Sequence, residues 1–283
     1  ITRFLKEEIM INNETFKALG IIGKPLRQSL SPYLHNYWIK KYGLASYYLP
    51  LPIDNINYLK GAIKKLNFLG LNITIPYKKS IFNQLDTIDE GARKIKAVNT
   101  LICINNKLKG FNTDIIGFKK GLLKKKWNKK RPVIVFGAGG AAEAILYFLK
   151  LENIKDITVV NRTKKKAIEI ARKYKNIKIS SDFKLDIKEA GLIINTSSLG
   201  MIGYPELTIN LNKVNKEAII YDIVYNPINT YIITEAKKNK LEVVTGLDMF
   251  LEQARASFEV WFKIKPEINT SLINNIKKKI RKR

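Results

Sequence analysis

The feature that most constrains the fold is the segment VIVFGAGGAA at residues 133–142. Its first four residues form a continuous apolar run, which is typical of a parallel strand buried on both faces. Gly137, Gly139 and Ala142 then occupy the three places of a G-x-G-x-x-G/A pattern. The first glycine permits a tight turn, the second leaves room for a pyrophosphate, and the small third residue lets helix and strand pack closely. We therefore expect a strand, a phosphate-binding turn and a helix whose N-terminal N–H groups face the phosphates.

Around this segment, apolar runs alternate with amphipathic stretches along almost the whole chain. Such alternation is typical of a parallel sheet covered by helices, so we predict an α/β fold. The apolar runs predict strands at residues 18–23, 46–53, 70–75, 97–104, 107–112, 133–136, 157–160, 192–195, 218–223 and 241–245. The amphipathic stretches predict helices at residues 31–42, 55–66, 141–151, 164–174 and 249–262, and a last helix that runs to the C-terminus. Ser31 is expected to cap the first helix, with Pro32 in its first turn.

Composition limits the classes of protein to which this chain can belong. Hydrophobic residues make up 46% of the 283 residues, enough to bury a sizeable core. At roughly 100–200 residues per domain, this length predicts two domains. The single cysteine, Cys103, excludes a disulfide framework within the chain, and the single histidine, His35, argues against a histidine metal cage or a Ser-His-Asp triad. We expect no metal, and no uncharged apolar stretch reaches the ~18 residues of a membrane span.

The N-terminal region lacks the charged segment, apolar core and cleavage site of a signal peptide, so we expect a cytoplasmic protein. Met10 is the first methionine, and we expect residues 1–9 to be an extension ahead of a start site or an addition to the natural chain. The sequence leaves a monomer and a homodimer open.

The chain is strongly basic, with 51 Lys and Arg against 24 Asp and Glu and a formal net charge of +27. Such a balance can indicate a nucleic-acid partner. However, only nine of the 51 are Arg, the residue on which base and phosphate recognition depends most. Because the Lys residues are spread over the whole chain, we interpret the charge as a solvated surface and expect neither a nucleic-acid nor a membrane partner. The densest basic run, residues 124–131, is expected to be a helix end and loop in water.

The segment after the next predicted strand bears on the type of nucleotide. In NAD-binding units an acidic residue about 20 residues beyond the glycine turn accepts a hydrogen bond from the ribose 2′-hydroxyl. Asn161, Arg162 and Thr163 stand at that place here, and Lys166 follows one turn into the helix. A guanidinium and a hydroxyl suit a 2′-phosphate, so the segment favours NADP over NAD. The alternative is that Thr163 only caps the helix.

Polar residues also follow several predicted strands in the first half of the chain. Four clusters share this position: Ser29 with Ser31; Asn72 with Thr74 and Lys78; Asn99 with Thr100; and Asn112 with Thr113 and Asp114. Ligands of open α/β sheets bind at the carboxyl ends of the strands. Hydroxyls, amides, one ammonium and one carboxylate suit a small polyhydroxy acid.

At this point the sequence resembles the shikimate dehydrogenase family, from about Gly23 to Phe258. Nine stretches carry the resemblance in order: GKPLRQSLSPYLHN (23–36), NITIPYK (72–78), AVNT (97–100), GFNTD (110–114), GAGGAA (137–142), NRT (161–163), NTSSLGM (195–201), YDIVYNP (221–227) and GLDMFLEQA (246–254). The resemblance implies an oxidoreductase that reversibly reduces 3-dehydroshikimate to shikimate with NADPH, a step toward chorismate and the aromatic amino acids.

The resemblance also implies roles for individual residues of the substrate half. Lys78 and Asp114 match the catalytic pair. Residues that match the family's substrate-binding positions are Ser29 and Ser31 for the carboxylate, Thr74 in the same pocket, Asn99 for the hydroxyls, Tyr225 near the carboxylate, and Gln253.

For the cofactor half, the matching residues are Gly137, Ala138, Gly139, Gly140, Ala141, Asn161, Arg162, Thr163 and Lys166, with Met201 and Gly246 close to the nicotinamide. One departure is Lys166, where many relatives have Arg. Losing the planar guanidinium fork weakens the expected hold on the 2′-phosphate, so the preference for NADP is less well supported than the binding of a nicotinamide cofactor.

The chemistry of the residues agrees with this resemblance. Adding a hydride to a ketone leaves an alkoxide, and the Lys78 ammonium can stabilise that charge and donate a proton. Asp114 can hold Lys78 in place, and its charge favours the protonated lysine while desolvation opposes it. His35 falls within the helix after SPY, and we expect it to be structural.

Three other interpretations remain open on the sequence alone. A quinate/shikimate dehydrogenase of the same family could use NAD. A glutamyl-tRNA reductase also follows its glycine turn with NRT, but needs a nucleophilic cysteine, and Cys103 lies within a predicted strand. A basic nucleic-acid-binding protein would bind DNA or RNA in a steeply salt-dependent manner.

We therefore predict two α/β domains with a cleft between them. Residues 1–114 would form an N-terminal substrate and catalytic domain, completed by helices at 247–283, because Gln253 has to reach the substrate. Residues 115–246 would form a Rossmann-like NADP-binding domain. The expected partners are the small-molecule substrate and NADP.

Overall fold

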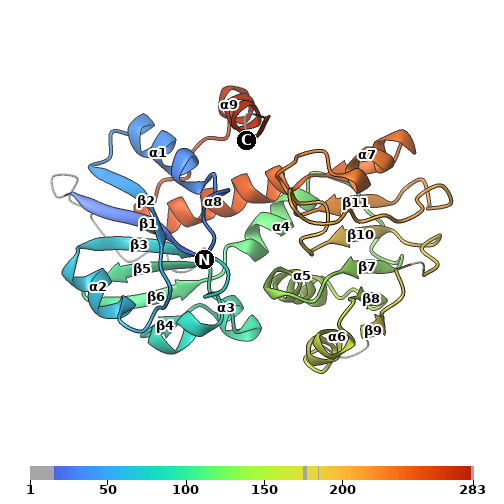
Figure 1. The fold of residues 1–283 in the computed structure, drawn as a ribbon, viewed down its shortest axis with the longest axis horizontal. Coiled ribbons are helices and arrows are strands. Elements are labelled where there is room, and N and C mark those ends of the chain that lie inside the picture. Colours follow the sequence, from blue (N-terminus) through green and yellow to red (C-terminus); the bar gives the residue numbers. More distant parts are fainter. Residues whose placement is uncertain (1–15, 175–176, 184, 282–283) are drawn as a thin grey trace. The chain divides into compact units, whose positions relative to one another are not determined.

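The computed structural model describes residues 16–174, 177–183 and 185–281 (Figure 1). The expected extension at residues 1–9 lies outside this part. The chain divides into two compact units: Ile1–Thr113 with Gln253–Leu272, and Asp114–Glu252 with Ile273–Arg283. Each unit holds one six-stranded sheet, so the predicted α/β fold with two sheets is confirmed.

The first unit contains a mixed sheet in the order β2-β1-β3-β5-β6-β4. Its strands are β1 (Lys17–Gly23), β2 (Ser46–Pro52), β3 (Phe68–Ile73), β4 (Thr87–Ile88), β5 (Thr100–Ile104) and β6 (Lys107–Phe111). Strand β1 pairs in parallel with β2 and β3, whereas β5 pairs antiparallel with both β3 and β6. Asn105 and Asn106 form the tight turn between β5 and β6, with φ of 48° and 60°, a conformation that asparagine tolerates well.

The helices of this unit are α1 (Ser31–Lys41), α2 (Leu59–Lys65), the 3-10 helix η1 (Ser80–Gln84) and α3 (Glu90–Ile95). The predicted N-cap of α1 is wrong: Leu30 takes that position, and Ser31 is the first helical residue. The Ser29 hydroxyl instead accepts a hydrogen bond from the Ser31 backbone N–H at 3.3 Å. Ser29 in the loop is therefore tied to the first residue of α1.

The second unit contains six parallel strands in the order β12-β11-β10-β7-β8-β9. The strands are β7 (Val133–Phe136), β8 (Ile157–Val160), β9 (Ile177–Ser180), β10 (Leu192–Asn195), β11 (Ile219–Asp222) and β12 (Glu242–Val244). Counted from β7, this order is 6-5-4-1-2-3, which is the doubly wound order of dinucleotide-binding sheets. The direction of winding reverses between β7 and β10, and ligands of such sheets bind at this point.

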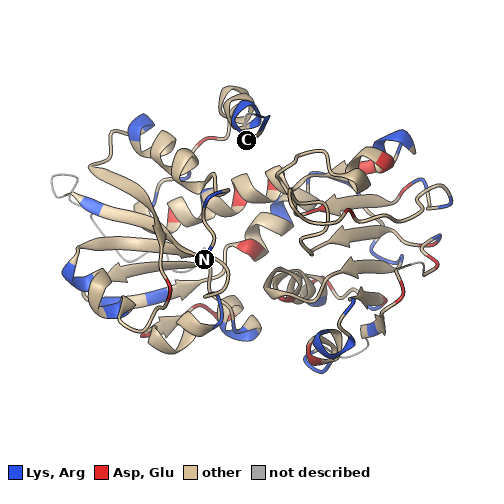
Figure 2. Cartoon of the chain, in the orientation of Figure 1, with Lys and Arg blue, Asp and Glu red and all other residues tan. Residues whose placement is uncertain are grey.

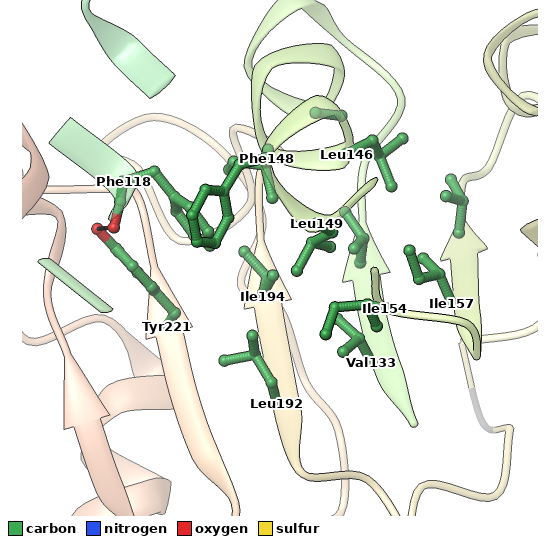
Figure 3. Packing of buried hydrophobic residues seen from close by; sticks show 14 of the residues in the cluster. Phe118, Val133, Leu146, Phe148, Leu149, Ile154, Ile157, Leu192, Ile194 and Tyr221 are labelled. Atoms are coloured by element: carbon green, nitrogen blue, oxygen red, sulfur yellow. Dashed lines mark hydrogen bonds between the residues drawn. The ribbon is translucent and has the colours of Figure 1, made fainter. Parts of the chain in front are cut away.

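The remaining helices are α4 (Asp114–Leu122), α5 (Gly140–Leu151), α6 (Lys164–Ala171), α7 (Tyr231–Lys238), α8 (Gly246–Phe262) and α9 (Thr270–Arg281). Successive residues of β7 pack into two different cores. Val133 and Val135 belong to the core beneath α5, and Ile134 and Phe136 belong to the core of the opposite face. Figure 3 shows Val133 with Leu149 of α5 on the first face. The prediction that this strand is buried on both faces is confirmed.

The basic run at residues 124–131 follows α4 and forms ion pairs within the second unit. Lys124 pairs with Asp248 at 2.9 Å, and Arg131 pairs with Glu189 at 2.9 Å. Figure 2 shows Lys and Arg on elements of both units. Each of these exposed pairs contributes little to stability, about 0–1 kcal/mol. No helix in the described ranges has the length and apolar character needed to cross a bilayer.

The single histidine, His35, is fully buried in the first unit. Its ring stacks on Tyr48 at 4.4 Å between centroids and lies 5.2 Å from the ring of Trp261. Neither ring nitrogen has a hydrogen-bond partner. Desolvation therefore lowers the pKa of His35 from 6.5 to about 3, and the imidazole acts as a neutral packing group.

This burial predicts a specific loss of stability in mild acid. The unfolded chain takes up a proton at His35 near pH 6.5, but the folded chain does not until about pH 3. Stability is therefore complete above pH 6.5 and falls as the pH drops below it. Between pH 7 and pH 5, His35→Phe should lose about 2 kcal/mol less unfolding free energy than the wild type. Urea titrations at both pH values measure this, and equal losses in the two proteins would contradict it.

Candidate functional site

The substrate half of the predicted site lies in the first unit, and a buried cluster of neutral polar side chains holds its residues. We call this cluster the hydroxyl cluster; its members are Asn72, Asn99, Thr100, Thr113 and Ser257, all at most 5% exposed. They come from the ends of β3, β5 and β6 and from α8. Buried polar groups of this kind need partners, and here they supply them to one another.

Ser257 is the centre of the hydroxyl cluster. Its hydroxyl lies 2.8 Å from that of Thr100 and 3.1 Å from that of Thr113. It also accepts a hydrogen bond from the Asn72 side-chain amide at 3.1 Å, and donates one to the backbone carbonyl of Gln253 at 3.1 Å. Ser257 thereby ties helix α8 to the strand ends.

The same cluster fixes the orientation of Asn99. Its side-chain oxygen accepts hydrogen bonds from the Thr113 backbone N–H at 2.7 Å and from the hydroxyls of Thr113 and Thr100, each at 3.1 Å. These protein donors fix the side-chain amide of Asn99 in one orientation.

Gln253 reaches the same place from α8. The Thr113 hydroxyl lies 3.5 Å from its side-chain oxygen, so Asn99 and Gln253 share Thr113 as a neighbour. Asp114 follows Thr113 directly, is 7% exposed and begins α4. The structure thus brings Asn99, Thr113 and Gln253 together, as the sequence predicted for Asn99 and Gln253.

Lys78 and Thr74 follow β3 in a short segment held by backbone hydrogen bonds on both sides. The Thr74 N–H donates to the Ile22 carbonyl at 2.9 Å, and the Lys78 carbonyl accepts from the Val98 N–H at 2.8 Å. Lys78 is half-buried. This pairing places the backbone of Lys78 beside the AVNT segment that ends in Asn99 and Thr100.

Ser31 connects to the hydroxyl cluster through Tyr48. The Tyr48 hydroxyl is hydrogen-bonded to the Ser31 side chain and donates to the Asn72 side-chain oxygen at 2.7 Å. Burial holds the pKa of Tyr48 well above its usual range, so it remains a neutral donor. The loop serines and the hydroxyl cluster form one continuous network.

The cofactor half of the predicted site lies in the second unit, at the glycine turn after β7. Gly137 has φ of +110°, which favours glycine. A Cβ at this position would lie 2.6 Å from the Thr196 hydroxyl and 3.0 Å from the Ser197 backbone nitrogen. The turn is therefore pressed against the end of β10, at the point where the sheet reverses its winding.

The next two glycines face open space. A Cβ added at Gly139 or Gly140 would meet no atom within 4 Å. Gly139 is the N-cap of α5 and provides no side chain to satisfy the first N–H groups of the helix. The Glu143 carboxylate in the first turn is buried and paired with Lys173 at 3.0 Å, which offsets its repulsion of an anion. Room, free donors and a helix N-terminus together suit a pyrophosphate.

The segment after β8 presents cations and polar groups to solvent. Arg162, Thr163 and Lys166 are exposed, and Asn161 donates a hydrogen bond to the Thr163 carbonyl at 2.8 Å. Thr163 is the N-cap of α6, but its side chain makes no capping hydrogen bond. The capping alternative for the Thr163 hydroxyl is therefore wrong, and this hydroxyl is available to a phosphate.

The remaining predicted residues follow β10 and β11. Met201 lies in the loop after β10, where its N–H donates to the Ser198 carbonyl at 3.1 Å. Tyr225 stacks on Phe250 of α8 at 4.8 Å between ring centroids. Gly246 begins α8 against β11, and a Cβ there would lie 2.3 Å from the Ile223 carbonyl oxygen. All three lie beyond the carboxyl ends of parallel strands.

Two alternative kinds of site lose support. Burial raises the pKa of the Cys103 thiol, which lies within β5, and this disfavours a thiolate nucleophile. Within residues 16–174, 177–183 and 185–281, no group of three or more His, Cys, Asp and Glu side chains is arranged to hold a metal ion.

Sequence reasoning missed Ser257 and Tyr48. The signal for Ser257 was its spacing, because residues 253 and 257 lie four apart and therefore share one helix face. Tyr48 carried no comparable signal.

We predict that Ser257→Ala lowers the free energy of unfolding by about 1–3 kcal/mol, because it leaves buried amide and hydroxyl partners of the serine unsatisfied. Urea denaturation measures the change. Ser80→Ala is the matched control, since Ser80 is exposed and its hydroxyl contacts only a backbone carbonyl at 3.4 Å. A loss in Ser257→Ala no larger than in the control would contradict the central place of Ser257.

Comparisons with known proteins give matches to both the substrate half and the cofactor half of the candidate site. The family model for the shikimate dehydrogenase substrate binding domain matches residues 21–101, and the shikimate / quinate 5-dehydrogenase model matches residues 121–240. The NADP(+)-dependent shikimate dehydrogenase of Pelagibacter ubique is 40% identical over 266 residues, covering 91% of this chain and 98% of the relative.

Solved structures give the same result. Shikimate 5-dehydrogenase from Thermus thermophilus, in complex with NADP(H) and shikimate, is 29% identical and superposes with a TM-score of 0.81 over 94% of this chain and 99% of that chain. Quinate dehydrogenase from Corynebacterium glutamicum, in complex with NAD, is 25% identical with a TM-score of 0.83, covering 95% of this chain and 99% of that chain.

Proposed function

Because the chain belongs to the shikimate dehydrogenase family, we propose that it reversibly reduces 3-dehydroshikimate to shikimate with NADPH, using Lys78 and Asp114 for the proton. The single observation that carries the residue assignment is the cluster of neutral donors around Asn99 and Gln253, beside the segment that bears Lys78. The product enters the route to chorismate and the aromatic amino acids.

The residues of the second unit fit NADP. The open glycine turn would hold the pyrophosphate, and Arg162, Thr163 and Lys166, with Asn161, would hold the 2′-phosphate. No acidic side chain stands at residues 161–163 to repel that phosphate. When bound, NADPH supplies a hydride to the carbonyl carbon of the substrate.

The residues of the first unit would bind and orient the substrate. Ser29 and Ser31 donate hydroxyl hydrogen bonds to the substrate carboxylate, with Thr74 in the same pocket. Asn99, whose side chain is oriented by Thr113 and Thr100, binds a ring hydroxyl. Gln253 binds a further hydroxyl, and Tyr225 acts near the carboxylate.

The proton step belongs to Lys78. Hydride addition at the carbonyl carbon breaks the C=O π bond and leaves its electron pair on oxygen as an alkoxide. Lys78 donates one proton to that oxygen and is reprotonated from solvent. Asp114 orients the ammonium and accepts a hydrogen bond from a substrate hydroxyl. In the direction of oxidation each transfer runs in reverse, with neutral Lys78 as the base.

We assign residues 1–114, completed by the helices at 247–283, to the substrate domain, and residues 115–246 to the NADP domain. The two compact units differ from this assignment at Asp114 and at residues 247–252 and 273–283, which belong to the second unit. The location of the polar residues in two separate sheets supports this division. We further propose that the enzyme acts in the cytoplasm as a monomer or homodimer, without a nucleic-acid partner. The spread of the Lys residues over the whole chain supports the last point.

Quinate is the second candidate substrate, with NAD as the second candidate cofactor. The similarity to a quinate dehydrogenase in complex with NAD and the lysine at position 166 favour testing both. Absorbance of the reduced nicotinamide at ~340 nm, followed with shikimate or quinate and with NADP⁺ or NAD⁺, distinguishes four combinations. We expect shikimate with NADP⁺ to give the highest kcat/KM.

Lys78→Ala should lower kcat by about 10²–10⁴-fold, the usual contribution of a general acid or base, while NADPH still binds. Steady-state assays with shikimate and a fluorescence titration with NADPH measure both quantities. Lys79→Ala is the matched control, because Lys79 is the exposed neighbour of Lys78 in sequence. Near-normal turnover by Lys78→Ala would overturn the assigned role.

Arg162→Ala should raise the KM for NADPH about tenfold or more and leave the KM for NADH unchanged, because only NADPH carries the 2′-phosphate. Arg172→Ala, a change at an exposed arginine just after α6, should alter neither constant. An equal rise for the two cofactors would show that Arg162 does not read the 2′-phosphate.

A further inference from the structure

A buried carboxylate lies at the carboxyl end of β11, in the second unit. Asp222 is the last residue of that strand and is 0% exposed. One carboxylate oxygen accepts hydrogen bonds from the Val224 backbone N–H at 2.9 Å and the Asn195 side-chain amide at 3.0 Å. The other oxygen accepts from the Thr230 hydroxyl at 2.6 Å.

The donors that reach Asp222 are neutral, which makes its position costly. A buried carboxylate without a cationic partner loses its hydration and regains only part of it from neutral donors. This desolvation raises the pKa of Asp222 to about 6, and the charge of Glu206 raises it further. An apolar side chain at this buried position would cost less free energy. We therefore infer that the role of the carboxylate is to hold the groups that donate hydrogen bonds to it.

Asp222 holds the loop after β10 through Asn195. The Asn195 amide donates both to Asp222 and to the Leu199 carbonyl, the latter at 2.9 Å. The Asn195 oxygen accepts from the Ser197 backbone N–H at 3.1 Å and from the Ser197 hydroxyl at 2.7 Å. The first turn of the loop that carries Met201 is thereby folded onto the end of β10.

Thr230 joins the same loop to the loop after β11. Gly200 has φ of +86°, and a Cβ there would lie 3.2 Å from the Thr230 Cβ, so the two residues are packed closely. The Ile202 N–H also donates to the Asn226 carbonyl at 3.4 Å. Residues 196–204 and 223–230 are therefore joined through Asp222, Thr230 and the hydrogen bond between Ile202 and Asn226.

We propose that Asp222, which is hydrogen-bonded to Asn195 and Thr230, is a positioning residue. It holds these two loops in the conformation that binds the nicotinamide half of NADP(H). The proposal rests on the proposed function, which assigns Tyr225 in these loops to the substrate, and on the family resemblance, which implies that Met201 lies close to the nicotinamide. Asp222 is buried beneath the loops and acts on the reaction through them. The adenosine half of the cofactor is bound elsewhere, by the residues after β8.

This division allows a test with two ligands. NADP⁺ carries both halves, whereas adenosine 2′,5′-bisphosphate carries only the adenosine with its 2′- and 5′-phosphates. Calorimetric titration of the full-length chain with each ligand separates an effect on the nicotinamide end from general damage to the unit. Turnover with shikimate then reports the geometry of hydride transfer.

Thr230→Val removes the donor to one carboxylate oxygen with almost no change of shape. We expect the Kd for NADP⁺ to rise about tenfold and kcat to fall by a similar factor, whereas the Kd for adenosine 2′,5′-bisphosphate stays within twofold. Thr234→Val is the matched control, because the Thr234 hydroxyl lies one turn further along α7 and donates only to the Thr230 carbonyl, at 3.0 Å. The control should change none of these constants.

Asp222→Asn and Asp222→Ala are a second pair of variants that test the same proposal. They can be used even if Thr230→Val does not fold. The asparagine retains one oxygen to accept from Val224 and Asn195, and alanine retains none. Asp222→Asn should therefore keep a Kd for NADP⁺ closer to that of the wild type than Asp222→Ala does.

Equal weakening of both ligands, or of neither, in Thr230→Val and in both Asp222 variants would overturn the positioning role. Failure of the proposed function would look different. In that case the wild type itself would bind neither ligand or would not turn over shikimate.

Discussion

The close approach between the glycine turn and the end of β10 is the constraint on which the second unit depends. Gly137 can lie against Thr196 and Ser197 only because it has no Cβ and adopts a positive φ. The turn also receives support from β8, since the Gly137 N–H donates to the Val160 carbonyl at 2.8 Å. The ends of β7, β8 and β10 therefore meet at Gly137. These contacts fix the position at which α5 begins.

The two halves of the candidate site differ in how their polar groups are satisfied. Those of the first unit are buried and bond to one another, whereas those of the second unit are exposed to solvent. In the first unit, Asn99 and Thr113 are buried and hydrogen-bonded to neutral partners. Such a pre-ordered network suits a small ligand with a fixed pattern of hydroxyls, because the geometry of the network is set by its own hydrogen bonds. In the second unit, Arg162 and Lys166 stay exposed and the helix N-terminus is open. That arrangement suits a long ligand with several anionic groups, because exposed cations and a helix N-terminus both attract negative charge.

The sequence predicted the elements whose pattern is local. The buried strand at 133–136, the turn at Asn105 and Asn106, and the order of sheet and helices follow from apolar runs and turn residues, and the structure agrees. Helices α4 and α7 and strand β9 were not predicted. Each is short, and α4 also contains glycines, so packing against the sheet decides its form rather than helix propensity.

Long-range contacts explain what sequence reasoning missed in the candidate site. Asn72 and Ser257 are bonded across 185 positions of the chain, and no local pattern indicates that pair. Asp222 lies in the stretch YDIVYNP, where one acidic residue after an apolar strand looks like any turn residue. Its importance becomes visible only when Asn195 and Thr230, from two other segments, are seen to converge on it.

Two buried titratable groups, His35 and Asp222, act on stability in opposite directions over one range of pH. Burial lowers the pKa of His35, so acid favours the unfolded chain. Burial raises the pKa of Asp222 to about 6, so the folded chain takes up that proton first and acid favours the folded state between about pH 6 and 4. The two effects offset one another in part, although they arise in different units. Acid sensitivity of the whole chain is therefore a poor guide to either group, and each is revealed by its own substitution.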